Sequence, residues 1–156
     1  MAHFDKAIPP GGEGKIRLSV RTSGYQGSIQ KSARVYTNDP DRNVVRLLLK
    51  GVVKVPIRLS PRHVRLYGKE DQILTRMIEV TAELDKPLEL TPSHFNLGEK
   101  LTYTIEEIEK GRRFQIHFKS MPSHPQAYRG FLKLKTNYPE KPEITIWIRV
   151  QIRKKG

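Results

Sequence analysis

Cysteine is absent from the 156 residues. Its absence excludes disulfide bonds, thiolate zinc sites and cysteine nucleophiles together. Long apolar runs are missing as well, and no stretch approaches the roughly 18 consecutive apolar residues of a membrane helix. Hydrophobic residues make up only 37% of the chain and aromatic residues 8%. This composition predicts a thin core, like that of a β-sandwich.

Patterns typical of enzymes are also lacking. No pair of histidines has the spacing of a metal site, and no serine lies in a Gly-x-Ser-x-Gly motif. The dense acidic cluster Glu106, Glu107 and Glu109 precedes the turn at Lys110-Gly111 and is followed by arginines. This arrangement favours a solvated turn over a pair of catalytic carboxylates. From these residues we expect no enzyme activity, no catalytic or metal site and no cofactor.

Acidic residues are scarce relative to basic ones. The chain has 29 lysines and arginines against 16 carboxylates, a formal charge of +13. The excess is spread along the chain, with +6 up to Val55 and +7 beyond it. A diffuse positive charge attracts polyanions and bears on association rather than on fold.

Basic and aromatic residues alternate in one part of the chain. Phe131 and two lysines lie on one expected strand, and Trp147 and two arginines lie on its expected neighbour. Such a face could stack bases and hold phosphates. Alternatively, Trp147 packs against the end of the preceding domain or at a sheet corner, with the arginines as a polar rim. The candidate polyanion patch consists of Lys133, Lys135, Trp147, Arg149 and Arg153.

A short motif occurs twice, 99 positions apart. Thr37, Asn38 and Pro40 of the first copy correspond to residues 136, 137 and 139 of the second. An alternating strand leads into each Thr-Asn, and a longer apolar strand follows the turn. A repeat near 100 residues has the length of one β-sandwich domain, so the chain is interpreted as two related domains.

Alternating apolar and polar residues, separated by Pro, Gly and Asn turns, predict an all-β protein without amphipathic helices. The segment 91–94 contains a proline and is expected to be a turn. The expected strands are 15–21, 29–36, 44–55, 57–59, 64–67, 73–82, 88–90, 101–108, 113–119, 129–135 and 144–152.

The junction between the copies is expected at Lys54-Val55-Pro56-Ile57, because proline cannot donate to a sheet ladder. We therefore expect tandem immunoglobulin-like sandwiches: residues 1–55 as the C-terminal part of a first one, and residues 56–156 as a second, complete one. The first copy has room for only its last three strands. This suggests a fragment of a longer protein, with unpaired edges that promote association.

The first copy resembles a bacterial family, the domain of unknown function 1573. The resemblance rests on Ile8-Pro9-Pro10-Gly11, Gly24-Tyr25-Gln26-Gly27, Tyr36-Thr37-Asn38-Asp39-Pro40 and Leu49-Lys50-Gly51, and covers residues 3–55. The second copy departs from the motif at Tyr138 and Val150. The resemblance implies an immunoglobulin-like fold close to PapD-like and Hydin-type sandwiches, a bacterial source and an extracytoplasmic location. It implies no catalytic residues.

The leading functional hypothesis is a non-catalytic protein-interaction or structural module. A protein partner or a second copy would pair with the strands at 44–55 and 144–152, because open edges offer backbone donors and acceptors. The candidate interface residues are Val44, Leu48 and Val52. The alternative is a basic domain that binds a polyanion or nucleic acid, and the sequence favours a protein partner over nucleic acid.

Overall fold

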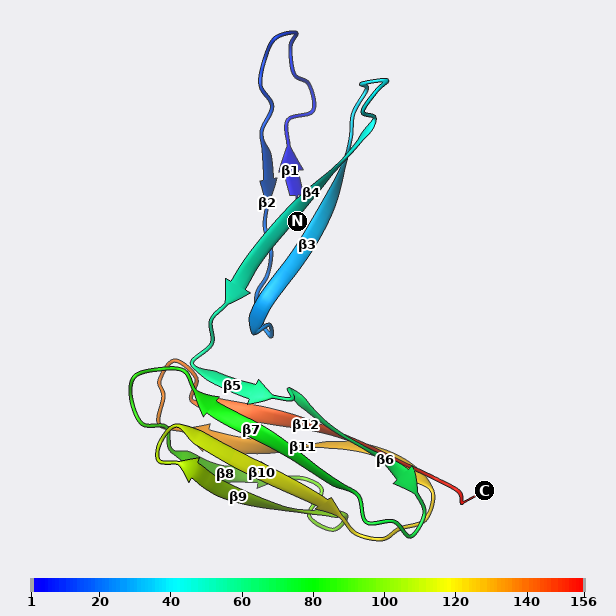
Figure 1. Cartoon of the computed structure of the whole chain (residues 1–156), viewed down its shortest axis with the longest axis vertical. Coiled ribbons are helices and arrows are strands. Elements are labelled where there is room, and N and C mark those ends of the chain that lie inside the picture. Colours follow the sequence, from blue (N-terminus) through cyan, green and yellow to red (C-terminus); the bar gives the residue numbers. More distant parts are fainter. Residues whose placement is uncertain (1, 156) are drawn as a thin grey trace. The chain divides into compact units, whose positions relative to one another are not determined.

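The computed structural model of the protein describes residues 2–155, and every regular element in that range is a β-strand (Figure 1). None of these residues belongs to a helix that is long and apolar enough to cross a membrane. The chain divides into two compact units, Met1–Lys54 and Val55–Gly156. The all-β class predicted from the alternating pattern is confirmed.

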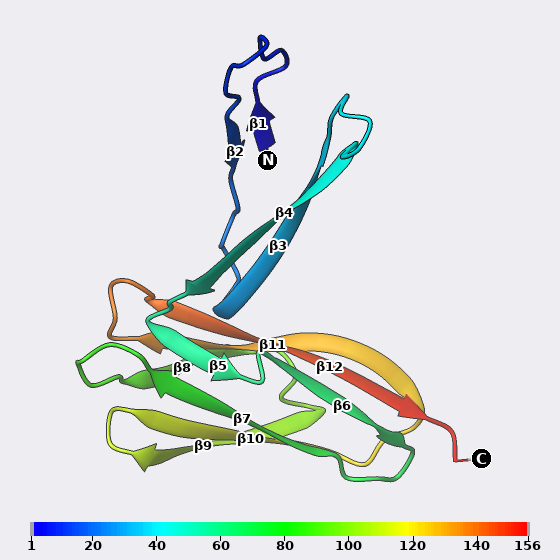
Figure 2. The ribbon, with the colours of Figure 1, turned by 45° about the horizontal axis from the view of Figure 1, so that its top comes forward.

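The second unit is a β-sandwich of two four-stranded sheets, which appear as two layers in Figures 1 and 2. One sheet has the order β5-β7-β10-β9 and the other the order β6-β12-β11-β8. Without β6 this is an immunoglobulin-like order, in which β5, β7, β10 and β9 face β8, β11 and β12. β6 adds a parallel neighbour to β12. The bounds are β5 (Ile57–Ser60), β6 (His63–Lys69), β7 (Thr75–Ala82), β8 (Leu90–Phe95), β9 (Leu101–Glu109), β10 (Arg113–Ser120), β11 (Gln126–Thr136) and β12 (Glu143–Arg153).

The core lies between these two sheets and follows the period of two predicted from the sequence. Successive side chains of a strand point to opposite faces. On β12 the five inward residues are therefore all apolar, and none is more than 4% exposed. On β10 the inward residues Phe114, Ile116 and Phe118 are buried in the same way. The inward residues of β12 are Ile144, Ile146, Ile148, Val150 and Ile152.

The segment 91–94, predicted as a turn, lies instead inside β8. β8 is one of the two edge strands of its sheet and pairs with β11 alone among the described strands. The register shifts between Lys133 and Leu134, so that Ser93 is left out of the ladder between His94 and Pro92. An edge strand with a bulge tolerates proline, which cannot donate to a ladder. For this reason the proline did not end the strand.

The first unit contains four strands rather than the three predicted. β1 (Ala2–Phe4) pairs with β2 (Ile16–Leu18), and β3 (Gly27–Tyr36) pairs with β4 (Val44–Val53). The additional strand is β1, which the sequence did not distinguish from the loop that follows it. No described residue of this unit is buried. A groove of about 740 Å³ separates the inner face of the β3–β4 hairpin from β2 and is lined by Leu18, Ala33 and Leu49.

The β3–β4 hairpin is a copy of the β11–β12 hairpin in the same register. Gly27 pairs with Val53 and Tyr36 pairs with Val44. Shifted by 99 positions, these pairs are Gln126 with Ile152 and Lys135 with Glu143, and both occur in the second unit. The same shift places β2 on β10. The repeat in the sequence is therefore also a repeat in pairing.

The two Thr-Asn turns share their hydrogen bonds. Thr37 donates its hydroxyl to the Arg42 carbonyl at 2.8 Å, and Thr136 donates to the Lys141 carbonyl at 2.5 Å. In both turns the amide two residues later, of Asp39 or Tyr138, donates to the same threonine hydroxyl. A threonine hydroxyl that satisfies two backbone groups stabilises a tight turn. This accounts for the identical spacing of the motif in its two copies.

Candidate functional site

The β3–β4 hairpin lacks the neighbours that its copy has. In the second unit β12 lies between β11 and β6, and β11 lies between β12 and β8. Within residues 2–155, β3 and β4 pair with each other and with no further strand. Each therefore presents a ten-residue edge of backbone donors and acceptors, which can pair with an additional strand.

The hydrogen-bond pattern of the hairpin shows which amides lie on the open edge. Thr37 donates its N–H to the Asn43 carbonyl at 3.0 Å, so these two residues form a hydrogen-bonded pair. Such pairs alternate with non-hydrogen-bonded pairs along an antiparallel ladder. Counted along the register, Val44, Leu48 and Val52 all fall in non-hydrogen-bonded pairs. Their N–H and C=O groups therefore point away from β3, toward the open edge.

The side chains of the same three residues lie on one face of the hairpin, with Arg46 and Lys50 between them. We call Val44, Leu48 and Val52 the apolar row. Val44 is 46% exposed, Leu48 48% and Val52 70%. Tyr36, directly opposite Val44, extends the row onto β3. The structure thus gives the predicted interface residues both an exposed apolar face and an open edge.

The expectation that residues 144–152 offer a second open edge is wrong. β12 pairs with β11 on one side and, in parallel, with β6 on the other. Three of the four outer strands of this sandwich carry features that oppose pairing: β5 has four residues, β8 has Pro92 and a bulge, and β9 has three glutamates and a bulge. The fourth, β6, pairs with β12 alone among the described strands and has neither a proline nor a bulge. The β3–β4 hairpin has neither a proline nor a bulge.

The five residues of the predicted polyanion patch lie on the outer face of the sheet β6-β12-β11-β8. Trp147 is in the middle of β12, is 55% exposed and meets Phe131 edge to face at 5.6 Å. The alternative position at a sheet corner is therefore wrong. Lys133 forms an ion pair with Glu143 at 3.1 Å, so its charge is partly neutralised.

Two further arginines, which the sequence analysis missed, lie beside Arg149. Arg129 on β11 and Arg65 on β6 are both in direct register with it, so three arginines cross three adjacent strands in one row. We call Arg65, Arg149 and Arg129 the arginine row. The sequence analysis placed only Arg149 on this face. The parallel pairing of β6 with β12 and the antiparallel pairing of β11 with β12 bring all three together.

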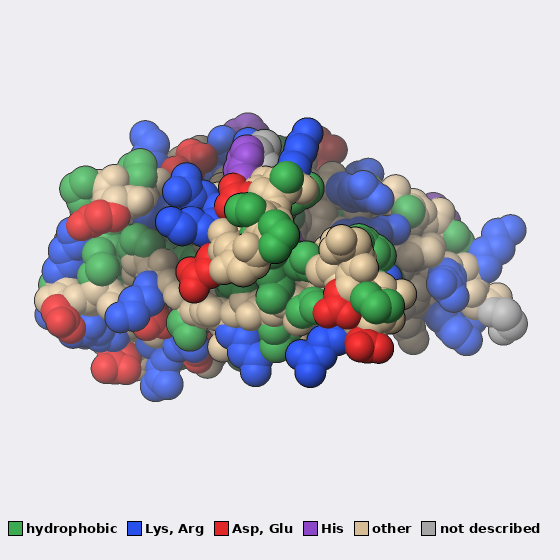
Figure 3. Space-filling model, turned by 90° about the horizontal axis from the view of Figure 1, so that it is seen from above, with side chains coloured by type: hydrophobic (Ala, Val, Ile, Leu, Met, Phe, Trp, Pro, Cys, Tyr) green, Lys and Arg blue, Asp and Glu red, His purple; other side chains and the backbone are tan. Residues whose placement is uncertain are grey.

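The two outer faces of the sandwich differ in charge. Alternation places three basic and three acidic side chains outward on the sheet β5-β7-β10-β9: Arg58, Arg113, Lys119, Glu79, Glu106 and Glu109. On the sheet β6-β12-β11-β8 it places seven basic side chains and one carboxylate outward: Arg65, Lys69, Arg129, Lys133, Lys135, Arg149, Arg153 and Glu143. In the view of Figure 3, Lys and Arg side chains are spread over the visible surface, with Asp, Glu and hydrophobic side chains between them. The positive field of the sandwich therefore comes mainly from one face.

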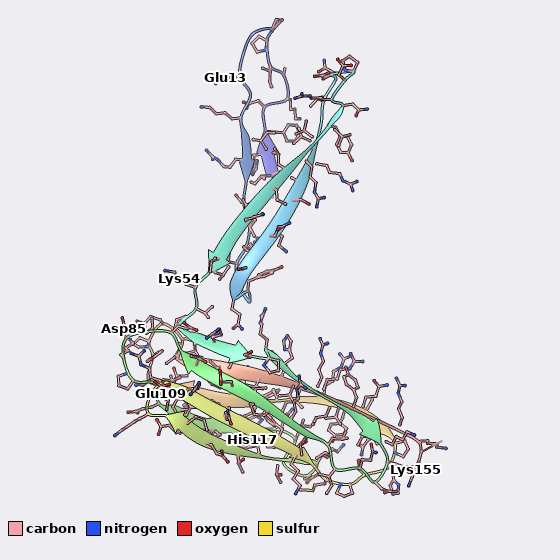
Figure 4. All side chains as sticks on the ribbon, viewed as in Figure 1. Glu13, Lys54, Asp85, Glu109, His117 and Lys155 are labelled. Carbon is pink, nitrogen blue, oxygen red and sulfur yellow. The ribbon has the colours of Figure 1, made fainter. Side chains whose placement is uncertain are left out.

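The acidic cluster has structural contacts. Glu106 lies 3.8 Å from His117, and the Glu107 carboxylate accepts a hydrogen bond from the Gly111 amide at 2.6 Å. Glu109 lies at the end of β9, beside this turn, and His117 lies midway along β10 (Figure 4). Within residues 2–155 no group of three or more His, Asp or Glu side chains is placed to hold a metal. No catalytic groups are evident among these residues.

Two of the groups with shifted pKa values, Tyr138 and Glu140, belong to the turn after β11. Tyr138 is fully buried and donates its hydroxyl to the Lys86 carbonyl; desolvation by burial raises its pKa. The pKa of Glu140 is lowered, first by a hydrogen bond from its own backbone amide and then by Lys86, whose ammonium lies 3.0 Å away. Burial also raises the pKa of Tyr128. Tyr138 and Glu140 fasten the turn to the loop between β7 and β8, whereas Tyr128 lies on β11 beneath the Lys100 ammonium.

The fold and the two surfaces define an all-β protein with an immunoglobulin-like sandwich and no evident catalytic groups. Among solved structures, the chain is similar to the ASH / PapD-like domain of human CEP192 (PapD-like domain 7), with a TM-score of 0.44 and 8% identity. The match covers 70% of this chain and 96% of that one. No family model and no curated protein matches the chain. The resemblance of residues 3–55 to the domain of unknown function 1573 therefore stays an expectation.

Proposed function

We propose that the protein is a non-catalytic interaction module that binds a second copy of itself by strand addition to the β3–β4 hairpin. The observation that carries this proposal is the repeat. The hairpin has the register of β11–β12 but lacks the two flanking strands that its copy has. A strand added at the β4 edge would take the place that β6 has beside β12.

The inner face of the hairpin supports the same proposal. The positions that correspond to the buried isoleucines of β12 are also apolar, but none of them is buried: Leu47, Leu49 and Val53 are half-buried and Val45 is exposed. Ile144 is 2% exposed, whereas the equivalent Val45 is 38% exposed. Removing apolar surface from water contributes roughly 25 cal/mol per Å². A partner that covers this face would therefore bury apolar side chains, as the second sheet does in the second unit, and this burial would stabilise the complex.

The turn at Asn38 offers a further contact. In the second unit the Asn137 amide donates to the Pro87 carbonyl at 3.0 Å and accepts from the Glu89 amide at 3.0 Å. The equivalent Asn38 has no such partner within the described part of the chain. Its amide group is available to bind the backbone of an added segment in the way that Asn137 binds the β7–β8 loop.

A second copy fits the open edge by symmetry. Most homo-oligomers close around a two-fold axis, which pairs a surface with itself. An antiparallel β4–β4 pairing centred on Leu48 would set Val44 of each copy opposite Val52 of the other. The intervening Arg46 and Lys50 would meet their counterparts as like charges. Salt screens such repulsion, so this dimer is expected to tighten as the salt concentration rises.

The test is the molar mass in solution, measured by light scattering across a wide concentration range. We expect the wild-type chain to be a dimer and Leu48→Lys to be a monomer, because the lysine places a charge in the centre of the apolar row. Leu48→Pro removes an edge N–H without removing a hydrogen bond of the hairpin, and it should also weaken the dimer. Thr104→Lys is the matched control, because it adds the same charge on the exposed side of β9. A monomeric wild type, or a Leu48→Lys variant that remains a dimer, would overturn the proposal.

A further inference from the structure

The arginine row has an arrangement that the fold alone does not favour. Neighbouring strands lie about 4.8 Å apart, so the three Cα atoms of the row fall within about 10 Å. Like charges directly opposite each other on a sheet are destabilising. Yet no carboxylate pairs with Arg65, Arg149 or Arg129, and none of them donates a hydrogen bond to another described residue. An anion bound over the row would remove this repulsion.

The surroundings of the row add to its positive potential. Arg153 and Lys69 are in register with each other four residues further along β12 and β6. The single outward carboxylate of the face, Glu143, is already paired with Lys133. The opposite face of the sandwich has as many outward carboxylates as basic groups. A polyanion would therefore be drawn to this face rather than spread over the whole sandwich.

A row of aromatic side chains adjoins the arginine row. Two residues before Arg149, Trp147 is in register with Phe131 on β11 and with His63 on β6. His94 on β8 continues the row, with its ring 5.4 Å from that of Phe131. Residues two apart on a strand are separated by about 6.7 Å. The rings therefore lie one step from the guanidinium groups, on the same flat and exposed surface.

An arginine row beside an aromatic row favours some polyanions over others. Inorganic polyphosphate would use the arginines and leave the rings of Trp147 and Phe131 without a partner. Single-stranded nucleic acid uses both, because its phosphates bind basic side chains and its bases stack on aromatic rings. We propose that the outer face of the sheet β6-β12-β11-β8 binds single-stranded nucleic acid, with phosphates on the arginine row and bases on Trp147 and Phe131.

The position of Trp147 makes the proposal directly measurable. It is the only tryptophan of the chain, so intrinsic fluorescence reports on the centre of this face. Titration with a 15-nucleotide oligothymidylate should quench the emission, because a base stacks on the indole. Inorganic polyphosphate at equal charge should bind more weakly and leave the emission unchanged. Each phosphate contact in single strands contributes about −0.7 to the slope of log K against log salt concentration, so three arginines predict a slope of about −2.

Matched double variants distinguish binding at the arginine row from attraction by the overall positive charge of the chain. Arg129→Ala with Arg149→Ala should lower the affinity at least about tenfold and reduce the salt slope by about 1.4. Arg113→Ala with Lys119→Ala removes the same charge from the outer face of the other sheet and should leave both quantities close to wild type. Because all four side chains are exposed, the variants should keep the wild-type unfolding midpoint.

A third variant tests base stacking on Trp147. Its affinity for a labelled oligonucleotide is measured by fluorescence anisotropy. Trp147→Ala should lower the affinity at least about fivefold, because stacking on one aromatic ring contributes that much or more per base. Three outcomes would overturn the proposal: oligothymidylate that does not quench Trp147, polyphosphate that quenches it equally, or a control double variant that loses as much affinity as the arginine pair.

Discussion

The two asparagines of the repeated turn provide a test of the structure within one chain. Asn137→Ala removes two hydrogen bonds of 3.0 Å, one to the Pro87 carbonyl and one from the Glu89 amide. Asn38→Ala makes the same chemical change at the equivalent turn, where the side chain has no such partner in the described residues. We expect the first substitution to destabilise the protein and the second to be nearly neutral.

The magnitude follows from the number and exposure of the bonds. A hydrogen bond of this kind contributes about 0.5–1.5 kcal/mol net. Asn137 is exposed, so water replaces part of what is lost, and we expect a total cost of about 1–2 kcal/mol. For a unit of this size each kcal/mol corresponds to a decrease of about 4–8 °C in the midpoint of thermal unfolding. Asn38→Ala should remain within about 0.5 kcal/mol of the wild type.

The measurement is thermal unfolding followed by two probes. Far-UV circular dichroism follows the strands of both units, and Trp147 fluorescence follows the second unit alone. If Asn137→Ala leaves the fluorescence midpoint unchanged, the asparagine does not fasten the β7–β8 loop. If Asn38→Ala lowers the dichroism midpoint as much as Asn137→Ala does, the first turn has a partner that the structure does not show. Either result would refute the reasoning.

Three further substitutions test the same region. Gly111 has a φ of 63°, and a Cβ atom there would lie 2.7 Å from the Pro87 Cβ, so Gly111→Ala should cost about 1–3 kcal/mol in the unfolding free energy. Tyr138→Phe leaves the partly buried Lys86 carbonyl without its donor and should cost about 1–2 kcal/mol in urea unfolding at pH 7. Because the folded pKa of Tyr138 is raised, the wild type should lose stability as pH rises above about 10, and the phenylalanine variant should lack this component. Because the folded pKa of Glu140 is lowered, its contribution is present above about pH 4.3 and is lost as pH falls through the folded value. The difference in midpoint between wild type and Glu140→Gln should therefore shrink at lower pH.

Much of the fold could be predicted from the sequence because strands of a sandwich alternate with a period of two. The inward isoleucines of β12 and the inward aromatics of β10 were identified in this way. β8 was missed because Pro92 was interpreted as a strand breaker, whereas only the sheet order shows that it occupies an edge. β1 was missed because three residues are too few to show alternation.

The candidate site was only partly predictable, because it depends on which strands are neighbours. Val44, Leu48 and Val52 could be placed on one face from the sequence alone. That their amides lie on an open edge follows from a hydrogen-bond pattern that begins at Thr37. Arg65 is separated from Arg149 by 84 positions, and no local pattern joins them. The parallel pairing of β6 with β12 brings them into register.

The same hairpin occurs twice with similar inner faces and different outer faces, and this difference separates the two proposals. On β12, Arg149 replaces Lys50 of β4 and keeps the positive charge, whereas Trp147 replaces Leu48 and adds an aromatic ring. The larger change is on the partner strand, where Arg129 replaces Gln30 and Phe131 replaces a serine, so only the second hairpin has complete aromatic and arginine rows. Added salt should then act in opposite directions: it screens the like charges between two β4 strands and tightens the dimer, and it weakens the binding of an oligonucleotide. If both equilibria respond to salt in the same direction, one of the two surfaces has been assigned to the wrong partner.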